Sequence, residues 1–112
     1  MAVARFDSIR TKAAGSITGS YTTVGSALAH NWRAFRLTNN TDGDLLISFD
    51  GTTDNIFLPK NGFALYDLST NSPPVSEVDN LVLALNTQFY VKQSTAPSTG
   101  ALWIEGMYAR GE

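Results

Sequence analysis

Apolar and polar residues alternate in short blocks through the middle of the chain. The apolar blocks occupy residues 32–38, 45–49, 56–58 and 63–68. Each block has the usual length of a β-strand and is too short for a stable helix. The breaks between the blocks are rich in Asn, Asp, Gly and Pro, which suit turn conformations. The pattern therefore predicts a β-meander over residues 32–68, with Asp42-Gly43 in a hairpin turn.

Period-two alternation predicts the buried face of each strand. The expected core residues are Phe35 and Leu37, Leu45, Ile47 and Phe49, Phe63 and Leu65, Phe89 and Val91, and Leu102 and Ile104. Residues 101–109 are apolar on both faces, which favours a central strand. Frequent turn signals without a helical pattern predict an all-β, single-domain β-sandwich or jelly roll of about seven to eight short antiparallel strands.

The chain divides into an N-terminal arm, residues 1–14, and a β-sandwich domain, residues 15–112. The periodicity of the arm fits either one short strand or a helical turn, and we expect the arm to be mobile unless it docks on something. The longest break is residues 69–80, which contain Pro73-Pro74. A break of this length is typical of a functional surface or of a crossover between sheets.

Composition limits the classes of partner. The 112 residues fit one domain, and the net charge of −2 comes with scattered Lys and Arg, so we expect no nucleic-acid partner. No apolar run is long enough to span a bilayer, so we expect no membrane partner. Charged residues make up only 16% of the chain. A surface poor in charge fits either a protein packed against neighbours or a soluble β domain with a Thr/Ser/Asn-rich face.

Residues that carry out chemistry are few. Cysteine is absent and His30 is the single histidine, whereas nucleophilic triads and most zinc sites need His or Cys. Four acidic residues lie in or beside two successive turns: Asp42, Asp44, Asp50 and Asp54. Such carboxylates are able to bind calcium, but Asp is also common in turns because it accepts local backbone hydrogen bonds. We therefore expect no enzyme activity, no cofactor and no metal centre.

Aromatic and apolar residues outside the expected core are candidate contacts with a partner. Leu46, Tyr66 and Tyr90 lie opposite the predicted core faces, where an exposed patch would mark a partner surface. Further candidates are Val3, Arg5 and Phe6 in the arm and Pro73 and Pro74 in the long loop. An alternative is a sugar-stacking platform built from Trp32, Tyr66, Tyr90, Trp103 and Tyr108.

Several phrases of the sequence resemble small virion proteins of tailed bacteriophages. They are residues 36–51 (RLTNNTDGDLLISFDG), 57–59 (FLP), 66–71 (YDLSTN) and 88–93 (QFYVKQ). Within that group, the chain length and the expected jelly roll resemble the capsid decoration, or cement, proteins of short-tailed phages. The resemblance implies a non-enzymatic protein, made in the bacterial host cytoplasm and located on the capsid surface of the virion.

The implied partner is the shell of major capsid protein, whose outside the protein binds and stabilises. The resemblance also implies a homo-oligomer, a dimer or a trimer. The same observations fit a head–tail connector or a tail component equally well. A small carbohydrate-binding module is the competing class.

Overall fold

The computed structural model describes residues 3–68 and 82–110, which form two packed antiparallel β-sheets. The strands are β1 (Val3–Phe6), β2 (Arg10–Ala13), β3 (Thr22–Val24), β4 (Trp32–Thr41), β5 (Leu45–Ser48), β6 (Ile56–Leu58), β7 (Phe63–Asp67), β8 (Phe89–Gln93) and β9 (Gly100–Arg110). One 3₁₀ turn, η1 (Ala14–Ser16), follows β2. The expected single-domain β-sandwich is confirmed.

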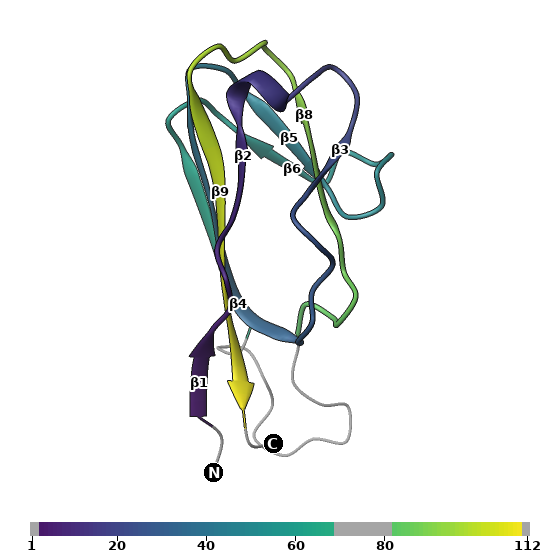
Figure 1. The fold of residues 1–112 in the computed structure, drawn as a ribbon, viewed down its shortest axis with the longest axis vertical. Helices are drawn as coiled ribbons and strands as arrows, with labels where there is room; N and C mark the ends of the chain where they lie inside the picture. Colours follow the sequence, from purple (N-terminus) through teal and green to yellow (C-terminus); the bar gives the residue numbers. More distant parts are fainter. Residues whose placement is uncertain (1–2, 69–81, 111–112) are drawn as a thin grey trace.

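The strand order is that of a jelly roll. One sheet has the order β1-β9-β4-β7, with β2 also paired to β9, and the other has the order β3-β8-β5-β6. β1 and β2 together act as one interrupted strand along the edge of β9. From β2 onward the chain alternates between the two sheets except at the β5–β6 hairpin, so each sheet is built from strands distant in sequence. Figure 1 shows the sheets as two layers.

The predicted meander over residues 32–68 is wrong. β4 continues to Thr41 in the five-stranded sheet, the chain then crosses to β5 and β6 in the other sheet, and β7 returns to pair with β4. Asp42-Gly43 therefore lies at a crossover between sheets and does not close a hairpin. The turn itself was predicted correctly. A turn sequence does not specify, however, whether the next strand pairs with the preceding strand or crosses to the other sheet.

Asn39 is the residue that holds this crossover. Its side chain is fully buried near the end of β4, where its Nδ2 donates to the carbonyl oxygens of Gly43 (2.9 Å), Leu58 (3.0 Å) and Pro59 (3.1 Å). Its Oδ1 accepts a hydrogen bond from the backbone N–H of Thr41 at 3.0 Å. One buried amide thus satisfies backbone groups from the end of β4, the following turn and the end of β6.

The core fills the space between the sheets. The predicted core residues of β4, β5, β8 and β9 are buried, and Phe49 packs against them. β9 is paired along both edges, which confirms the expected central strand. Val24, Leu28 and Trp32 complete the centre of the core, where the Trp32 and Phe89 rings lie 5.8 Å apart.

The N-terminal segment is docked on the sandwich. β1 pairs with residues 107–110 and β2 with residues 101–104 of β9. Between them, Asp7 accepts a 3.0 Å hydrogen bond from Nε1 of the buried Trp32, and the Arg10 guanidinium lies over the Trp32 ring at 5.0 Å. The segment expected as an arm therefore supplies an edge of the five-stranded sheet.

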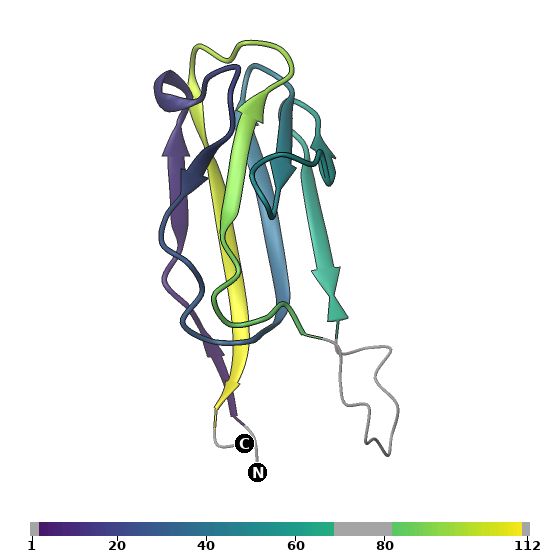
Figure 2. The same cartoon turned by 90° about the vertical axis from the view of Figure 1, so that its right-hand side faces the viewer.

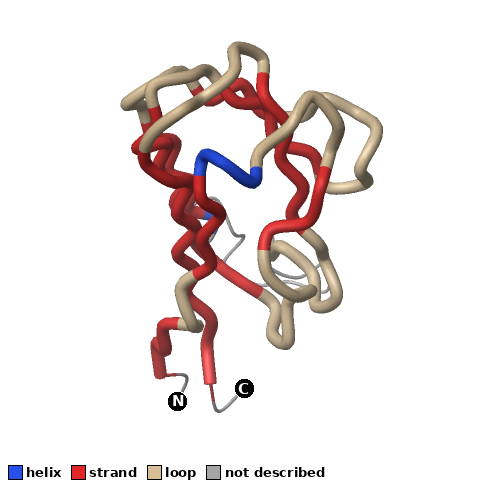
Figure 3. The backbone as a smooth tube through the Cα atoms, turned by 45° about the horizontal axis from the view of Figure 1, so that its top comes forward, coloured by secondary structure: helices blue, strands red, loops and turns tan. Residues whose placement is uncertain are grey.

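β1 and the end of β9 form a two-stranded extension at one end of the molecule. Figure 2 shows this extension on the opposite edge of the sheet from β7. Figure 3 shows that nearly all of the described backbone is strand and loop. The segment 69–81, which contains Pro73 and Pro74, lies outside the described residues, but the strands on either side of it belong to different sheets, as a crossover requires. Within the described ranges, no helix has the length and apolar character to cross a membrane.

Replacing Asn39 with Ala is expected to lower the free energy of unfolding by about 2–4 kcal/mol, because the buried amide that donates to the carbonyl oxygens of Gly43, Leu58 and Pro59 is removed. Urea denaturation at neutral pH measures the loss. Asn40→Ala is the matched control, since Asn40 is the exposed neighbour on the same strand, and it is expected to change the value by less than ~0.5 kcal/mol. Equal losses in both variants would contradict a role for the buried amide.

Candidate functional site

The orientation of β7 creates an apolar outer face on the five-stranded sheet. Phe63 and Leu65 were predicted to lie in the core, and that prediction is wrong: they are 67% and 64% exposed. The pairing of β7 with β4 sets Leu65 opposite Arg36 and Ala64 opposite Leu37. Since Leu37 is buried and Arg36 is exposed, the even-numbered side chains of β7 turn inward and the odd-numbered ones outward.

Exposed apolar side chains from three strands, β1, β7 and β9, share this outer face. Phe6 on β1 is 80% exposed, and it lies opposite Met107 of β9 in the strand pairing. Trp103 on β9 is 36% exposed and lies opposite Thr38, which in turn lies opposite Phe63. A sheet face with this many exposed large apolar residues is unusual for a protein that works alone in water, and it indicates an interaction surface.

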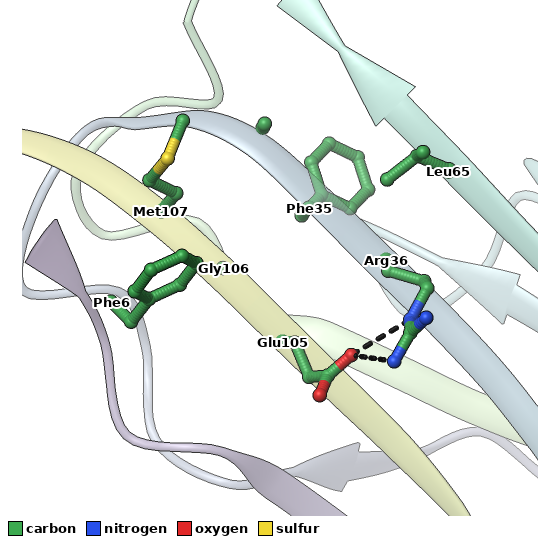
Figure 4. Close-up of a pocket in the computed structure, with 8 residues that line it drawn as sticks. Phe6, Phe35, Arg36, Leu65, Glu105, Gly106 and Met107 are labelled. Carbon is green, nitrogen blue, oxygen red and sulfur yellow. Dashed lines mark hydrogen bonds and ion pairs between the residues drawn. The ribbon is translucent and has the colours of Figure 1, made fainter. Parts of the chain in front are cut away.

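A shallow hollow of about 370 Å³ lies in this face. Figure 4 shows Phe6 and Met107 on one side of it and Leu65 on the other. Ala34, Phe35 and Gly106 also line the hollow. Its lining is largely apolar, so it suits an apolar side chain of a partner and offers few groups for a reaction.

One ion pair crosses the middle of the outer face. Arg36 on β4 and Glu105 on β9 are cross-strand partners, and Nε and Nη2 of Arg36 lie 2.8 and 2.6 Å from the Oε1 atom of Glu105 (Figure 4). The two side chains are 49% and 43% exposed. An exposed pair of this kind contributes little to folding stability, about 0–1 kcal/mol. It does place one positive and one negative charge beside the hollow.

The candidate contact residues from the sequence do not form one site. Phe6 lies on the outer face, and Val3 and Arg5 are exposed on the same edge strand, β1. Leu46 and Tyr90 are half-buried on the other sheet, where Leu46 lies between Phe57 and Lys92. Tyr66 lies on the five-stranded sheet at an inward-turned position of β7; it is 36% exposed, and its ring stacks on Phe35 with centroids 5.1 Å apart. Pro73 and Pro74 fall outside the described residues.

Sequence reasoning named Trp103 only within a set of candidate surface aromatic residues, and it missed the other main members of the outer face, namely Leu65, Phe63, Met107 and the Arg36–Glu105 pair. The block Phe-Ala-Leu-Tyr-Asp-Leu is apolar on both parities, so alternation alone does not decide which face is buried. Side-chain size offered a signal. The small Ala64 fits between an edge strand and the core, whereas Phe63 and Leu65 would need more room there.

The aromatic residues proposed for a sugar platform are dispersed. Trp32 is fully buried, and Tyr108 is half-buried and stacks on His30 at 3.8 Å. Tyr66 stacks on a core ring and Tyr90 lies in the opposite sheet, so Trp103 stands apart from the other four. The stacking of His30 on Tyr108 also gives the single histidine a packing role.

The acidic turn residues accept hydrogen bonds from nearby groups. Asp42 accepts from the Ser98 hydroxyl (2.6 Å) and from the backbone N–H groups of Ser98 (2.7 Å) and Thr99 (3.2 Å), which lowers the pKa of Asp42 to about 2. Asp50 accepts from the backbone N–H and the hydroxyl of Thr53 and from other local groups, and these bonds also lower its pKa. In the part of the chain that is described, no three His, Cys, Asp or Glu residues are grouped to hold a metal ion.

Comparisons with known proteins give a likeness to solved structures and none to a known sequence family. No protein-family model and no curated protein sequence match the chain. Among solved structures, the chain is similar to the Dit protein (gp 19.1) of phage SPP1, described as a paradigm of the hub adsorption apparatus in phages that infect Gram-positive bacteria. The match has a TM-score of 0.40 and 14% identity, and it covers 95% of this chain and 48% of that one. The chain thus spans about half the length of that protein.

The inward orientation of Tyr66 predicts unequal effects of two neighbouring substitutions. Leu65→Ser is expected to change the free energy of unfolding by less than ~0.5 kcal/mol, because Leu65 is exposed. Tyr66→Ser is expected to lower it by about 1.5–3 kcal/mol, because the Tyr66 ring stacks on the buried Phe35. Denaturation in dilute solution compares the two variants. A larger loss for Leu65→Ser would restore the orientation predicted from the sequence.

The lowered pKa of Asp42 predicts a stability that depends on pH in the acid range. Because the folded pKa of about 2 is below the usual 3.8, the charged carboxylate stabilises the fold above about pH 4, and this contribution disappears as the pH falls towards 2. The difference in unfolding free energy between the native protein and an Asp42→Ala variant should therefore be constant near neutral pH and shrink in that window. A difference that grew on acidification would contradict the assignment.

Proposed function

We propose that this chain is a non-enzymatic structural protein of a tailed-phage virion, and specifically a capsid decoration protein that binds and stabilises the outside of the head shell. The observation that carries the proposal is the apolar outer face of the five-stranded sheet, which leaves Phe6, Phe63 and Leu65 more than half exposed. Such a face suits assembly, and the sequence phrases that resemble phage virion proteins supply the biological setting.

The chemistry of the described residues supports assembly over catalysis. Asp42 and Asp50 accept hydrogen bonds from nearby backbone groups, the lone histidine stacks on a tyrosine, and the hollow has a largely apolar lining. The aromatic side chains that would form a sugar platform are dispersed over the core and both sheets. These features favour a binding protein that recognises another protein surface.

Decoration would stabilise a shell by mass action. A protein that binds the assembled shell and does not bind loose subunits adds RT ln(1 + [L]/Kd) at each site. At a free concentration of about 100 times Kd, this amounts to ~2.7 kcal/mol per site. Because an icosahedral shell repeats its sites many times, a modest gain at each site adds up to substantial resistance against rupture by the packaged DNA.

Co-sedimentation tests the proposal. The purified protein is mixed with empty capsid shells and, separately, with tails of the phage that encodes it. We expect saturable binding to shells at a copy number near that of the shell subunits, and loss of binding in the Leu65→Ser variant. Phe57→Ser, which alters an exposed aromatic on the other sheet, is the control expected to bind like the native protein. Binding to tails alone would refute decoration and favour a tail or head–tail component.

A further inference from the structure

The edges of the two sheets differ in how open they are to a further strand. In the described part of the chain, the edges lie at β1 and β2, β7, β3 and β6. β3 and β6 are only three residues long; Lys12 Nζ donates to the Thr23 carbonyl of β3 at 2.8 Å, and Pro59 follows the end of β6. The edge formed by β1 and β2 is interrupted and carries Arg5, Arg10 and Lys12. Short strands, Pro and basic side chains are usual means of keeping an edge unpaired.

The β7 edge is open by comparison. The five residues of β7, Phe-Ala-Leu-Tyr-Asp, include no Lys, Arg, Pro or Gly. β7 is the last strand of its sheet and pairs with β4 alone. Phe63 and Leu65 project from it onto the outer face, where both are exposed. An apolar edge strand with this length and composition is suited to pairing with a strand from another protein.

The register of β7 determines which of its backbone groups are free. The Asn39 N–H donates to the Gly62 carbonyl at 2.8 Å, so these two residues are a hydrogen-bonded pair of the β4–β7 ladder. Such pairs recur at every second residue of an antiparallel ladder. The N–H and C=O groups of Ala64 therefore point at β4, whereas those of Phe63 and Leu65 point away from the sheet. Among the described residues, none forms a backbone hydrogen bond with these outward groups.

We propose that a partner protein adds a strand at this edge, as an extended segment that pairs with β7 and carries apolar residues at alternate positions. The outward groups of Phe63 and Leu65 are two residues apart, a spacing of about 7 Å that the backbone of a β-strand matches. Residues of the added strand opposite Phe63 and Leu65 would share the outer face with them. Apolar side chains at those positions would bury both.

This added strand rests on the proposed function, because it would come from the virion partner that covers the outer face. β7 borders that face, and Leu65 lies both on the open edge and in the lining of the hollow. A partner that contributes one extended segment to the edge is therefore placed to cover the hollow as well. A second copy paired through β7 would extend the sheet sideways and leave the hollow uncovered.

Proline substitution tests the backbone pairing. Leu65→Pro removes an outward N–H and no hydrogen bond to β4, so the fold is expected to persist, as it does with Pro on other edge strands. Leu65→Val is the matched reference, since it keeps the N–H and an apolar side chain. In co-sedimentation with empty capsid shells, we expect the dissociation constant of Leu65→Pro to exceed that of Leu65→Val on the order of 10-fold or more.

Two further variants control for the effects of Pro itself. The Asp7 N–H is bonded to the Gly106 carbonyl, so by the same alternation the N–H of Ala4 points outward from β1, at the opposite edge of the sheet. Ala4→Pro is therefore expected to bind shells like the native protein. Ala64→Pro removes an N–H that points at β4, and it is expected to lower the melting temperature more than Leu65→Pro does. Circular dichroism establishes which variants are folded.

Hydrogen exchange gives a readout that needs no variant. In the free protein, the amides of Phe63 and Leu65 are expected to exchange rapidly and the amide of Ala64 slowly. In the complex with shells, the amides of Phe63 and Leu65 should become protected. Light scattering of the free native protein shows whether β7 pairs with a second copy instead.

The outcomes separate the added strand from the proposed function. Shell binding without protection of the two amides, or equal dissociation constants for Leu65→Pro and Leu65→Val, would overturn the added strand alone. Binding to tails alone, with protection of the same amides, would refute decoration and support the added strand. A dimer of the free protein with those amides already protected would assign the edge to a second copy and overturn the added strand. Binding to neither shells nor tails would refute both.

Discussion

The packing around Trp32 underlies the arrangement of the whole sandwich. Its ring is fully buried where β4, β9 and the N-terminal segment meet, and a Cβ on Gly106 would lie only 2.2 Å from the ring. Glycine at position 106 therefore lets the central strand pass directly beneath the indole. The ring also lies under the Arg10 guanidinium, and its N–H is bonded to Asp7. One side chain thus joins the core to an edge of the sheet.

This contact explains why the N-terminal strands form part of the sandwich. β1 and β2 are short, and four-residue strands at an edge gain little from pairing alone. Arg10 is nearly buried, and it also donates to the carbonyl oxygens of Ser26 (3.1 Å) and Ser8 (3.2 Å). Burial by itself would raise the pKa of Asp7, but the bonds from Trp32 and Ser8 and the charge of Arg10 lower it overall. The segment is held because its polar groups are satisfied at the surface of the core.

The docked edge strand has a direct consequence for the interaction surface. With β1 in place, Phe6 projects beside Met107 and bounds the hollow that Leu65 bounds from β7. The face therefore depends on strands from the beginning, middle and end of the chain. The contacts of the N-terminal segment with Trp32 and the crossover at Asn39 fix the two sides of this face relative to each other. A specific protein interface requires contact residues held in such fixed positions.

The pattern of apolar and polar residues was enough to predict the all-β class, most strand positions and most of the core. Alternation was decisive in β5 and β8, where large apolar residues occupy one parity and polar or mixed residues the other. It also marked β9 as central, because that strand is apolar on both faces. Local patterns are enough here, since the alternation of apolar and polar residues along a strand indicates directly which face is buried.

The crossing at Asn39, the orientation of β7 and the assembly of the outer face depend on contacts between strands that are distant in sequence. A turn sequence is compatible with pairing or with crossing, and the choice was made by a buried amide whose carbonyl partners lie up to 20 residues away. β7 is apolar on both parities, so its orientation was set by pairing with β4, where Leu37 faces the core. The outer face joins Phe6, Leu65 and Met107 from three strands, and no local pattern specifies which distant strands become neighbours.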